Sequence, residues 1–279
     1  MTSPALFPAA EPRTGGAARR FLADQRRANP ALFWTGALNV ALALLALALL
    51  PFDHRVVTGL PVWMKPLKFS VSIVAYAWTL GWLLAQLPEP AQRPARRLGL
   101  GVAVSMLVEQ AVIFIQAARG TTSHFNVGSA LDGALFGIMG WFILVNTLMT
   151  FWALWLMWRH RPRGAAGLVW GMRLGLLVFI AGSLVGGVMI RLNQHTVGAP
   201  DGGPGLAALG WSTRAGDLRA AHFLGMHALQ VLPLLGWAAS RYRPRRAAGL
   251  TWAGAALYAG AVGGLFAWAL LGRPLWAGQ

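Results

Sequence analysis

The fold class is visible first in residues 29–51, which read NPALFWTGALNVALALLALALLP. Asn29 is a good helix cap, Pro30 fits the first helical position, and the following residues are almost all apolar as far as Pro51. A helix needs about 20 such residues to cross a hydrocarbon core of roughly 30 Å. The stretch therefore predicts a transmembrane helix.

Six more apolar runs of similar length follow the first. Over the whole chain of 279 residues, 56% are hydrophobic and only 11% are charged, which is too few charges to cover a soluble domain. We therefore predict an all-α polytopic helix bundle, with one transmembrane domain over residues 30–279. Its seven spans are expected at residues 31–51, 64–87, 98–118, 130–158, 167–190, 218–240 and 248–272.

The basic residues predict the orientation of the bundle. Fifteen of the 24 Lys and Arg lie before the first span or in the loops that share its side, and the positive-inside rule places that side in the cytoplasm. Residues 1–29 then form a flexible basic cytoplasmic tail, residues 191–217 form a long periplasmic loop, and the C-terminus is periplasmic. We find no transit-peptide pattern, and the Arg-, Ala- and Gly-rich usage favours a bacterial inner membrane.

Two compositional features exclude some functions. The chain has no cysteine, which excludes disulfides, thiolate metal sites and a cysteine nucleophile. The net charge of +16 is typical of nucleic-acid binding in other contexts, but here topology accounts for most of it, so no nucleic-acid partner is expected. The expected partners are membrane lipids and an anionic small molecule or lipid, and the oligomeric state is left open.

Polar side chains inside spans are costly, and three spans carry them in helical register. The three stripes are Lys65, Lys68, Ser72, Tyr76 and Thr79; Ser105, Glu109, Gln116 and Arg119; and Arg219, His222, Met226 and Gln230. The alternative is ordinary hydrogen bonding between helices. Counted inward from the helix ends, Glu109, Tyr76 and Gln230 fall near one level, which predicts a shared pocket open to the periplasm.

Residue types suggest roles in this pocket. Glu109 or His222 is the expected acid or base, with Tyr76 as a further catalytic candidate. The only two lysines of the chain, Lys65 and Lys68, are expected to hold a phosphate or carboxylate. The remaining ligand-binding candidates are Ser72, Gln116, Arg119, Asn126, Arg191, Arg219, Met226 and Gln230. Asp132 and Asp217 are explained as helix caps, whereas no structural role accounts for Arg219.

The histidines offer an alternative function. His124, His195, His222 and His227 all lie on the expected periplasmic half, where they suggest a divalent metal site or, with weaker support, haem b. Three functions therefore remain open. The first is an anion-binding protein or membrane enzyme that uses Glu109 and His222. The second is a metal- or haem-dependent oxidoreductase, and the third is a transporter or channel with Glu109 as a proton or cation site.

Overall fold

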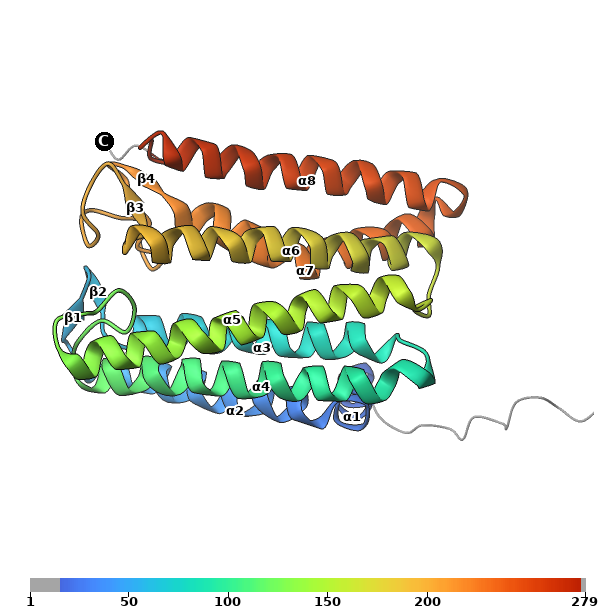
Figure 1. Ribbon diagram of the computed structural model, residues 1–279, viewed down its shortest axis with the longest axis horizontal. Coiled ribbons are helices and arrows are strands. Elements are labelled where there is room, and N and C mark those ends of the chain that lie inside the picture. Colours follow the sequence, from blue (N-terminus) through green and yellow to red (C-terminus); the bar gives the residue numbers. More distant parts are fainter. Residues whose placement is uncertain (1–15, 277–279) are drawn as a thin grey trace, which may run out of the picture.

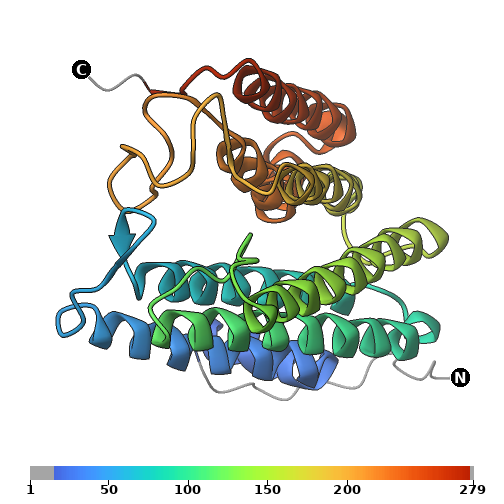
Figure 2. The same cartoon turned by 60° about the vertical axis from the view of Figure 1, so that its left-hand side comes forward.

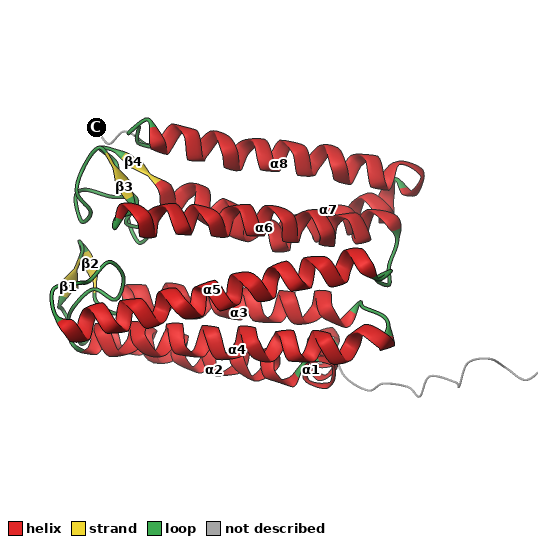
Figure 3. Ribbon diagram, viewed as in Figure 1, coloured by secondary structure: helices red, strands yellow, loops and turns green. Residues whose placement is uncertain are grey.

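The computed structural model describes residues 16–276, and helices dominate this part of the chain (Figure 3). The order of elements is shown in Figure 1. The elements are α1 (Ala17–Ala28), α2 (Pro30–Leu49), β1 (Val56–Val57), β2 (Leu60–Pro61), α3 (Met64–Ala85), α4 (Glu89–Ala118), α5 (Ala130–Arg159), α6 (Ala166–Leu192), β3 (Thr196–Val197), β4 (Gly216–Asp217), α7 (Leu218–Tyr242), the 3-10 turn η1 (Pro244–Arg246) and α8 (Ala247–Leu270).

Seven helices are long and apolar enough to cross a membrane, namely α2 to α7 and the stretch from η1 through α8. The predicted seven-span helical bundle is therefore confirmed. The predicted start of the first span is also confirmed, because Pro30 is the first residue of α2 and the Asn29 side chain accepts a hydrogen bond from the Leu32 amide at 3.3 Å.

The N-terminal segment contains a helix that apolar runs did not predict. Residues 17–28 lie in the expected flexible tail and form α1, which packs against α2 and α3. The sequence has no apolar run here because α1 is amphipathic: Gln25 is buried, whereas Arg26 and Arg27 of the last turn are exposed. The rest of the predicted tail, residues 1–15, lies outside the described residues.

The bundle has two groups of helices, with α1 to α5 in one and α6 to α8 in the other (Figure 1). In the second group, glycines allow α6 and α7 to approach closely. A Cβ added to Gly225 would lie 2.5 Å from the Cα atom of Gly182. Gly171 and Gly175 face the α7 backbone in the same way, and Gly186 faces the His222 ring.

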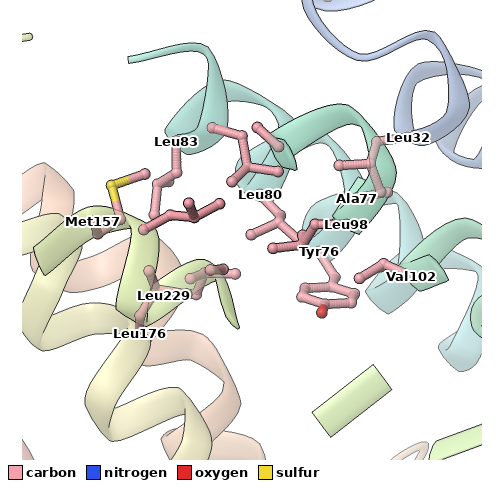
Figure 4. Packing of buried hydrophobic residues seen from close by; sticks show 14 of the residues in the cluster. Leu32, Tyr76, Ala77, Leu80, Leu83, Leu98, Val102, Met157, Leu176 and Leu229 are labelled. Atoms are coloured by element: carbon pink, nitrogen blue, oxygen red, sulfur yellow. The ribbon is translucent and has the colours of Figure 1, made fainter. Parts of the chain in front are cut away.

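The two ends of the bundle differ in character. The "loop-rich end" carries residues 50–63, 119–129 and 193–217 with all four strands, and the "arginine-rich end" carries α1 and the α3–α4, α5–α6 and α7–α8 connections (Figure 1). Toward the arginine-rich end, α3, α4, α5, α6 and α7 bury a tight apolar core. Figure 4 shows part of this core, including Leu80, Leu83, Leu98, Met157 and Leu176.

Candidate functional site

The loop-rich end holds a line of three ionisable side chains from three segments, of which Glu109 is buried and the other two are half-buried. His124 lies in the α4–α5 loop, between Glu109 of α4 and Lys65 of α3. Its Nε2 atom is 3.3 Å from Glu109 Oε1, and its Nδ1 atom is 3.1 Å from Lys65 Nζ. Both ring nitrogens are therefore within reach of a charged group. We call Lys65, His124 and Glu109 the "central triad".

Local backbone geometry brings the α4–α5 loop back into the bundle. Gly120 follows α4 with a φ of 73°, which glycine adopts easily and other residues rarely do. Phe125 also has a left-handed φ, of 57°, and its ring packs against a buried cluster of α6 and α7 that includes Met189 and Leu218. In Figure 2 the loop projects between the two helix groups. This course of the chain places His124 beside Glu109, fifteen residues earlier in the sequence.

The surroundings of His124 favour one protonation state. Burial, together with the positive charges of Lys65 and neighbouring histidines, holds the pKa of His124 well below its ordinary value. The neutral ring then donates from Nε2 to Glu109 and accepts at Nδ1, where the Ser123 hydroxyl also lies 3.1 Å away. Glu109 is only 3% exposed, and its Oε2 atom has no hydrogen-bond partner among the described residues. One carboxylate oxygen is therefore left for another group.

A second histidine–carboxylate pair lies next to the central triad. His195 Nδ1 is 2.6 Å from Asp201 Oδ2, and the Phe125 ring lies 4.8 Å from the His195 ring. Burial lowers the pKa of His195 although Asp201 opposes the shift. Burial alone would raise the pKa of Asp201, but hydrogen bonds from His195 and Thr196 outweigh it and hold that pKa well below its usual range. His195 is thus neutral and donates to an ionised Asp201.

The two lysines sit differently from one another. Lys65 lies in the central triad, whereas Lys68, one turn further along α3, donates to the carbonyls of Ala208 and Leu209 at 3.2 and 3.1 Å. These carbonyls belong to the long α6–α7 connection, which folds back on itself through a bridge between Gly205 and Ser212. The loop therefore covers Lys68 with neutral oxygen acceptors rather than with a carboxylate.

Two of the three arginines predicted to bind a ligand are neutralised by carboxylates. Arg219 contacts Asp217 at 2.6 Å, Arg119 contacts Asp132 at 2.6 Å, and only Arg191 of the three predicted arginines lies exposed without a carboxylate partner among residues 16–276. The expectation that Arg219 has no structural role is wrong, because Asp217 both caps α7 and pairs with it. The lysines are therefore left as the main candidates for holding an anion.

The prediction that Glu109, Tyr76 and Gln230 lie at the same depth in the bundle is wrong. Gln110 donates to the Pro66 carbonyl and to Ser70, so this part of α4 lies beside the first turns of α3. Tyr76 lies eleven residues beyond Lys65, or about 16 Å deeper at 1.5 Å per residue. The error arose because α4 has 30 residues and α3 only 22, so α4 extends further toward the loop-rich end. Counting residues inward from Arg119 therefore overestimates the depth of Glu109 relative to α3.

Tyr76 and Gln230 instead belong to a deeper polar layer between helices. Tyr76 donates to Asn146 at 3.0 Å and lies 3.2 Å from the Thr150 hydroxyl, while its ring stacks on Phe179. Gln230 donates to the Ala75 carbonyl and to Thr79, both at 3.3 Å. These contacts join α3 to α5 and α7. They fit the alternative of ordinary hydrogen bonding between helices. Catalytic or ligand-binding roles for these two residues therefore gain no support.

The other predicted site residues have local partners. His222 Nδ1 lies 2.8 Å from the Gly182 carbonyl, which ties the ring to α6. Gln116 donates to Asp132 at 2.8 Å and accepts from Arg119. Met226 accepts from Ser183 at 3.5 Å, and Asn126 donates to Thr121 and to the Thr122 carbonyl. Ser72 lies exposed one turn beyond Lys68.

The four histidines predicted to bind metal do not form such a site. His124 and His195 face Glu109 and Asp201, His222 faces a carbonyl, and the His227 ring packs 4.2 Å from that of Phe223. Within residues 16–276, no group of three or more His, Asp or Glu is arranged to hold a metal ion. The metal prediction therefore gains no support.

Sequence reasoning missed the pairing of Glu109 with His124 and the role of Asp201. One signal was available: residues 119–126 are the densest polar stretch of the chain, which is typical of a binding loop.

Comparisons with protein-family models, with curated proteins and with solved structures give no match. What is shown is a multi-pass membrane helix bundle.

Proposed function

We propose that this protein is a membrane enzyme that binds a phosphate or carboxylate group at its loop-rich end and acts on it by acid/base chemistry. The ligand is a small anion or the headgroup of an anionic amphiphile. One observation carries the proposal: His124 is held between a buried carboxylate and an ammonium, with both ring nitrogens in hydrogen-bond reach. A carboxylate that orients an imidazole in this way is the arrangement used for proton transfer in many hydrolases.

Each member of the central triad has a role in this proposal. Glu109 fixes the Nε2–H tautomer of His124 and stabilises the imidazolium that forms. In hydrolysis of an ester of this anion, the bound ligand draws Lys65 away from His124 Nδ1. Nδ1 then takes a proton from water as the water oxygen bonds to the phosphorus or carbonyl carbon, and returns that proton to the ester oxygen as the bond to this oxygen breaks. Lys65 and Lys68 hold the anionic group, and Lys68 exchanges the carbonyls of Ala208 and Leu209 for it. His124 thus takes the part that sequence analysis assigned to His222.

Packing favours an enzyme over a transporter. A transport pathway would have to continue from Glu109 to the arginine-rich end. Beyond the deeper polar layer of Tyr76 and Gln230, the bundle is filled by leucines that are fully buried, such as Leu80 and Leu83 (Figure 4). A site confined to the loop-rich end agrees better with acid/base chemistry at one membrane surface.

Anion binding can be tested on the purified protein in detergent. We expect 20 mM inorganic phosphate to raise its thermal midpoint relative to chloride at equal ionic strength, because a ligand at about 20 times its Kd stabilises by roughly 1.8 kcal/mol. Lys65→Met and Lys68→Met should each remove most of this shift. The matched control is Arg214→Met, an exposed cation in the same loop region, which should keep it. Equal shifts in all three variants would rule out the lysine site.

We further propose a bacterial inner membrane, with the loop-rich end in the periplasm. The support is the excess of arginine at the other end and the positive-inside rule. Because the chain has no cysteine, a Gly203→Cys variant should react with an impermeant maleimide added to intact spheroplasts, and an Arg161→Cys variant only after lysis. The reverse labelling pattern would overturn this orientation and place the triad in the cytoplasm.

A further inference from the structure

A groove on the surface of the bundle has the form of a site for one lipid chain. It runs between α2 and α4 with a volume of about 560 Å³, and its walls are almost entirely apolar. Its lining includes Trp34, Leu38, Leu100, Ala103 and Val104. Each wall spans eight residues, from 31 to 38 on α2 and from 100 to 107 on α4, or about 10 Å of helix. Trp34 is 57% exposed and Val104 is 42% exposed, so the groove opens to the surroundings of the bundle.

The end of the groove nearest α1 is positively charged. Arg26 lies over the ring of Trp34, a groove residue, with its guanidinium carbon 5.9 Å from the ring centroid. Arg97 lies three residues before Leu100 on α4, which is the same helical face. Both arginines are exposed, and neither has a carboxylate partner among residues 16–276. Two guanidinium groups that have no carboxylate partner in this part of the chain therefore flank an apolar groove.

The position of α1 is fixed relative to α4 by specific hydrogen bonds. Arg96 Nε donates to the Ala28 carbonyl at 3.2 Å, and the Asn29 side chain donates to the Ala95 carbonyl at 3.1 Å. The α1–α2 junction is thus held against α4, and Arg26 and Arg97 stay at the same end of the groove. This end lies at the first turn of α2, where a span passes from the headgroup region into the hydrocarbon. The exposed Trp34 is typical of that boundary.

We propose that this groove binds an anionic phospholipid of the leaflet that faces the arginine-rich end. The phosphate group would contact Arg26 and Arg97, since guanidinium groups pair well with phosphate oxygens. One acyl chain would lie against Leu38, Ala103 and Val104. Charge complementarity selects the anionic headgroup over a zwitterionic one, because juxtamembrane arginines attract anionic lipids. This site is separate from the central triad and lies at the opposite end of the bundle.

Native mass spectrometry and thermal unfolding test the site on the detergent-purified protein. The probes are phosphatidylglycerol and phosphatidylcholine with identical acyl chains. We expect phosphatidylglycerol to bind and to stabilise the protein more than phosphatidylcholine does. The variant Arg26→Gln/Arg97→Gln should bind phosphatidylglycerol about tenfold more weakly. Val104→Trp, which fills the groove, should weaken the binding of both lipids.

A matched control separates a site from general surface charge. Arg161→Gln/Arg245→Gln removes two exposed arginines from the same end of the bundle but outside the groove. It should leave the preference for phosphatidylglycerol unchanged. An equal loss in both double variants, or a preference that survives in Arg26→Gln/Arg97→Gln, would overturn the proposal. The single variant Arg97→Gln, at an exposed surface position, serves if the double variant does not fold.

Discussion

Replacing Glu109 by Gln is expected to destabilise the protein by about 2 kcal/mol, and Lys65→Met by a similar amount, whereas the double variant should recover at least about 1 kcal/mol of the sum. Lys65 and Glu109 attract each other across His124. Each single change leaves the other charge buried without its counter-charge, while the double change removes both. Because Lys65 is only partly buried, the expected loss is below the range for fully buried pairs.

Urea unfolding in detergent micelles measures the free energy of unfolding of the wild type, the two single variants and the double variant. The control is Glu89→Gln at the start of α4, an exposed carboxylate on the same helix, which should change the free energy of unfolding by less than about 0.5 kcal/mol. Strictly additive effects of the two single variants would show that the charges do not interact. A fully stable Glu109→Gln variant would show that Glu109 is already protonated in the folded protein. Either result would weaken the acid/base role assigned to the central triad.

Most of the fold was predictable because the membrane requires it. Unpaired backbone groups are too costly in hydrocarbon, so long apolar runs must become helices, and hydropathy therefore located all seven spans. Local caps were equally readable: Ser129 accepts from the Asp132 amide at 3.1 Å, and Asp217 accepts from the Arg219 amide at 3.0 Å, as their positions suggest. These features depend on residues close together in the chain.

The candidate site was less predictable because it depends on how neighbouring helices are aligned along the membrane normal. Periodicity places Glu109 on a polar face of its helix but does not tell which residue of the next helix lies beside it. The contact between Gln110 and Ser70 fixes that alignment, and it pairs Glu109 with the level of Lys65 rather than with that of Tyr76. The approach of His124 depends on a loop that turns back into the bundle, for which hydropathy has no signal.

Charge pairing within a loop is an intermediate case. Asp217 and Arg219 are two residues apart at a helix start, and a carboxylate there can cap the helix and bind the arginine at once. The sequence contained this information, but the cap alone was inferred. An arginine close to a predicted capping carboxylate is therefore better assumed to form a salt bridge with it, unless the structure shows otherwise. In this chain the rule leaves Lys65 and Lys68 as the cations of interest.

The largest loss of stability is expected at the α6–α7 contact. Gly225→Leu should destabilise the protein by more than about 3 kcal/mol or prevent folding, because a side chain there would overlap the Gly182 backbone. The close approach of these helices matters for function as well as for stability. It brings the Gly182 carbonyl to His222 at 2.8 Å, and Leu218 of the first turn of α7 belongs to the buried cluster against which Phe125, the residue after His124, packs.

Glycines elsewhere in the second helix group separate this effect from a general intolerance of leucine. Gly187 of α6 and Gly260 of α8 have no atom within 4 Å of an added Cβ, so Gly187→Leu and Gly260→Leu should change the unfolding midpoint little. Their side chains would point away from neighbouring helices. If Gly187→Leu proved as harmful as Gly225→Leu, the close contact between α6 and α7 would not be what holds the second helix group together. Folding yield in detergent and the thermal midpoint decide between these outcomes.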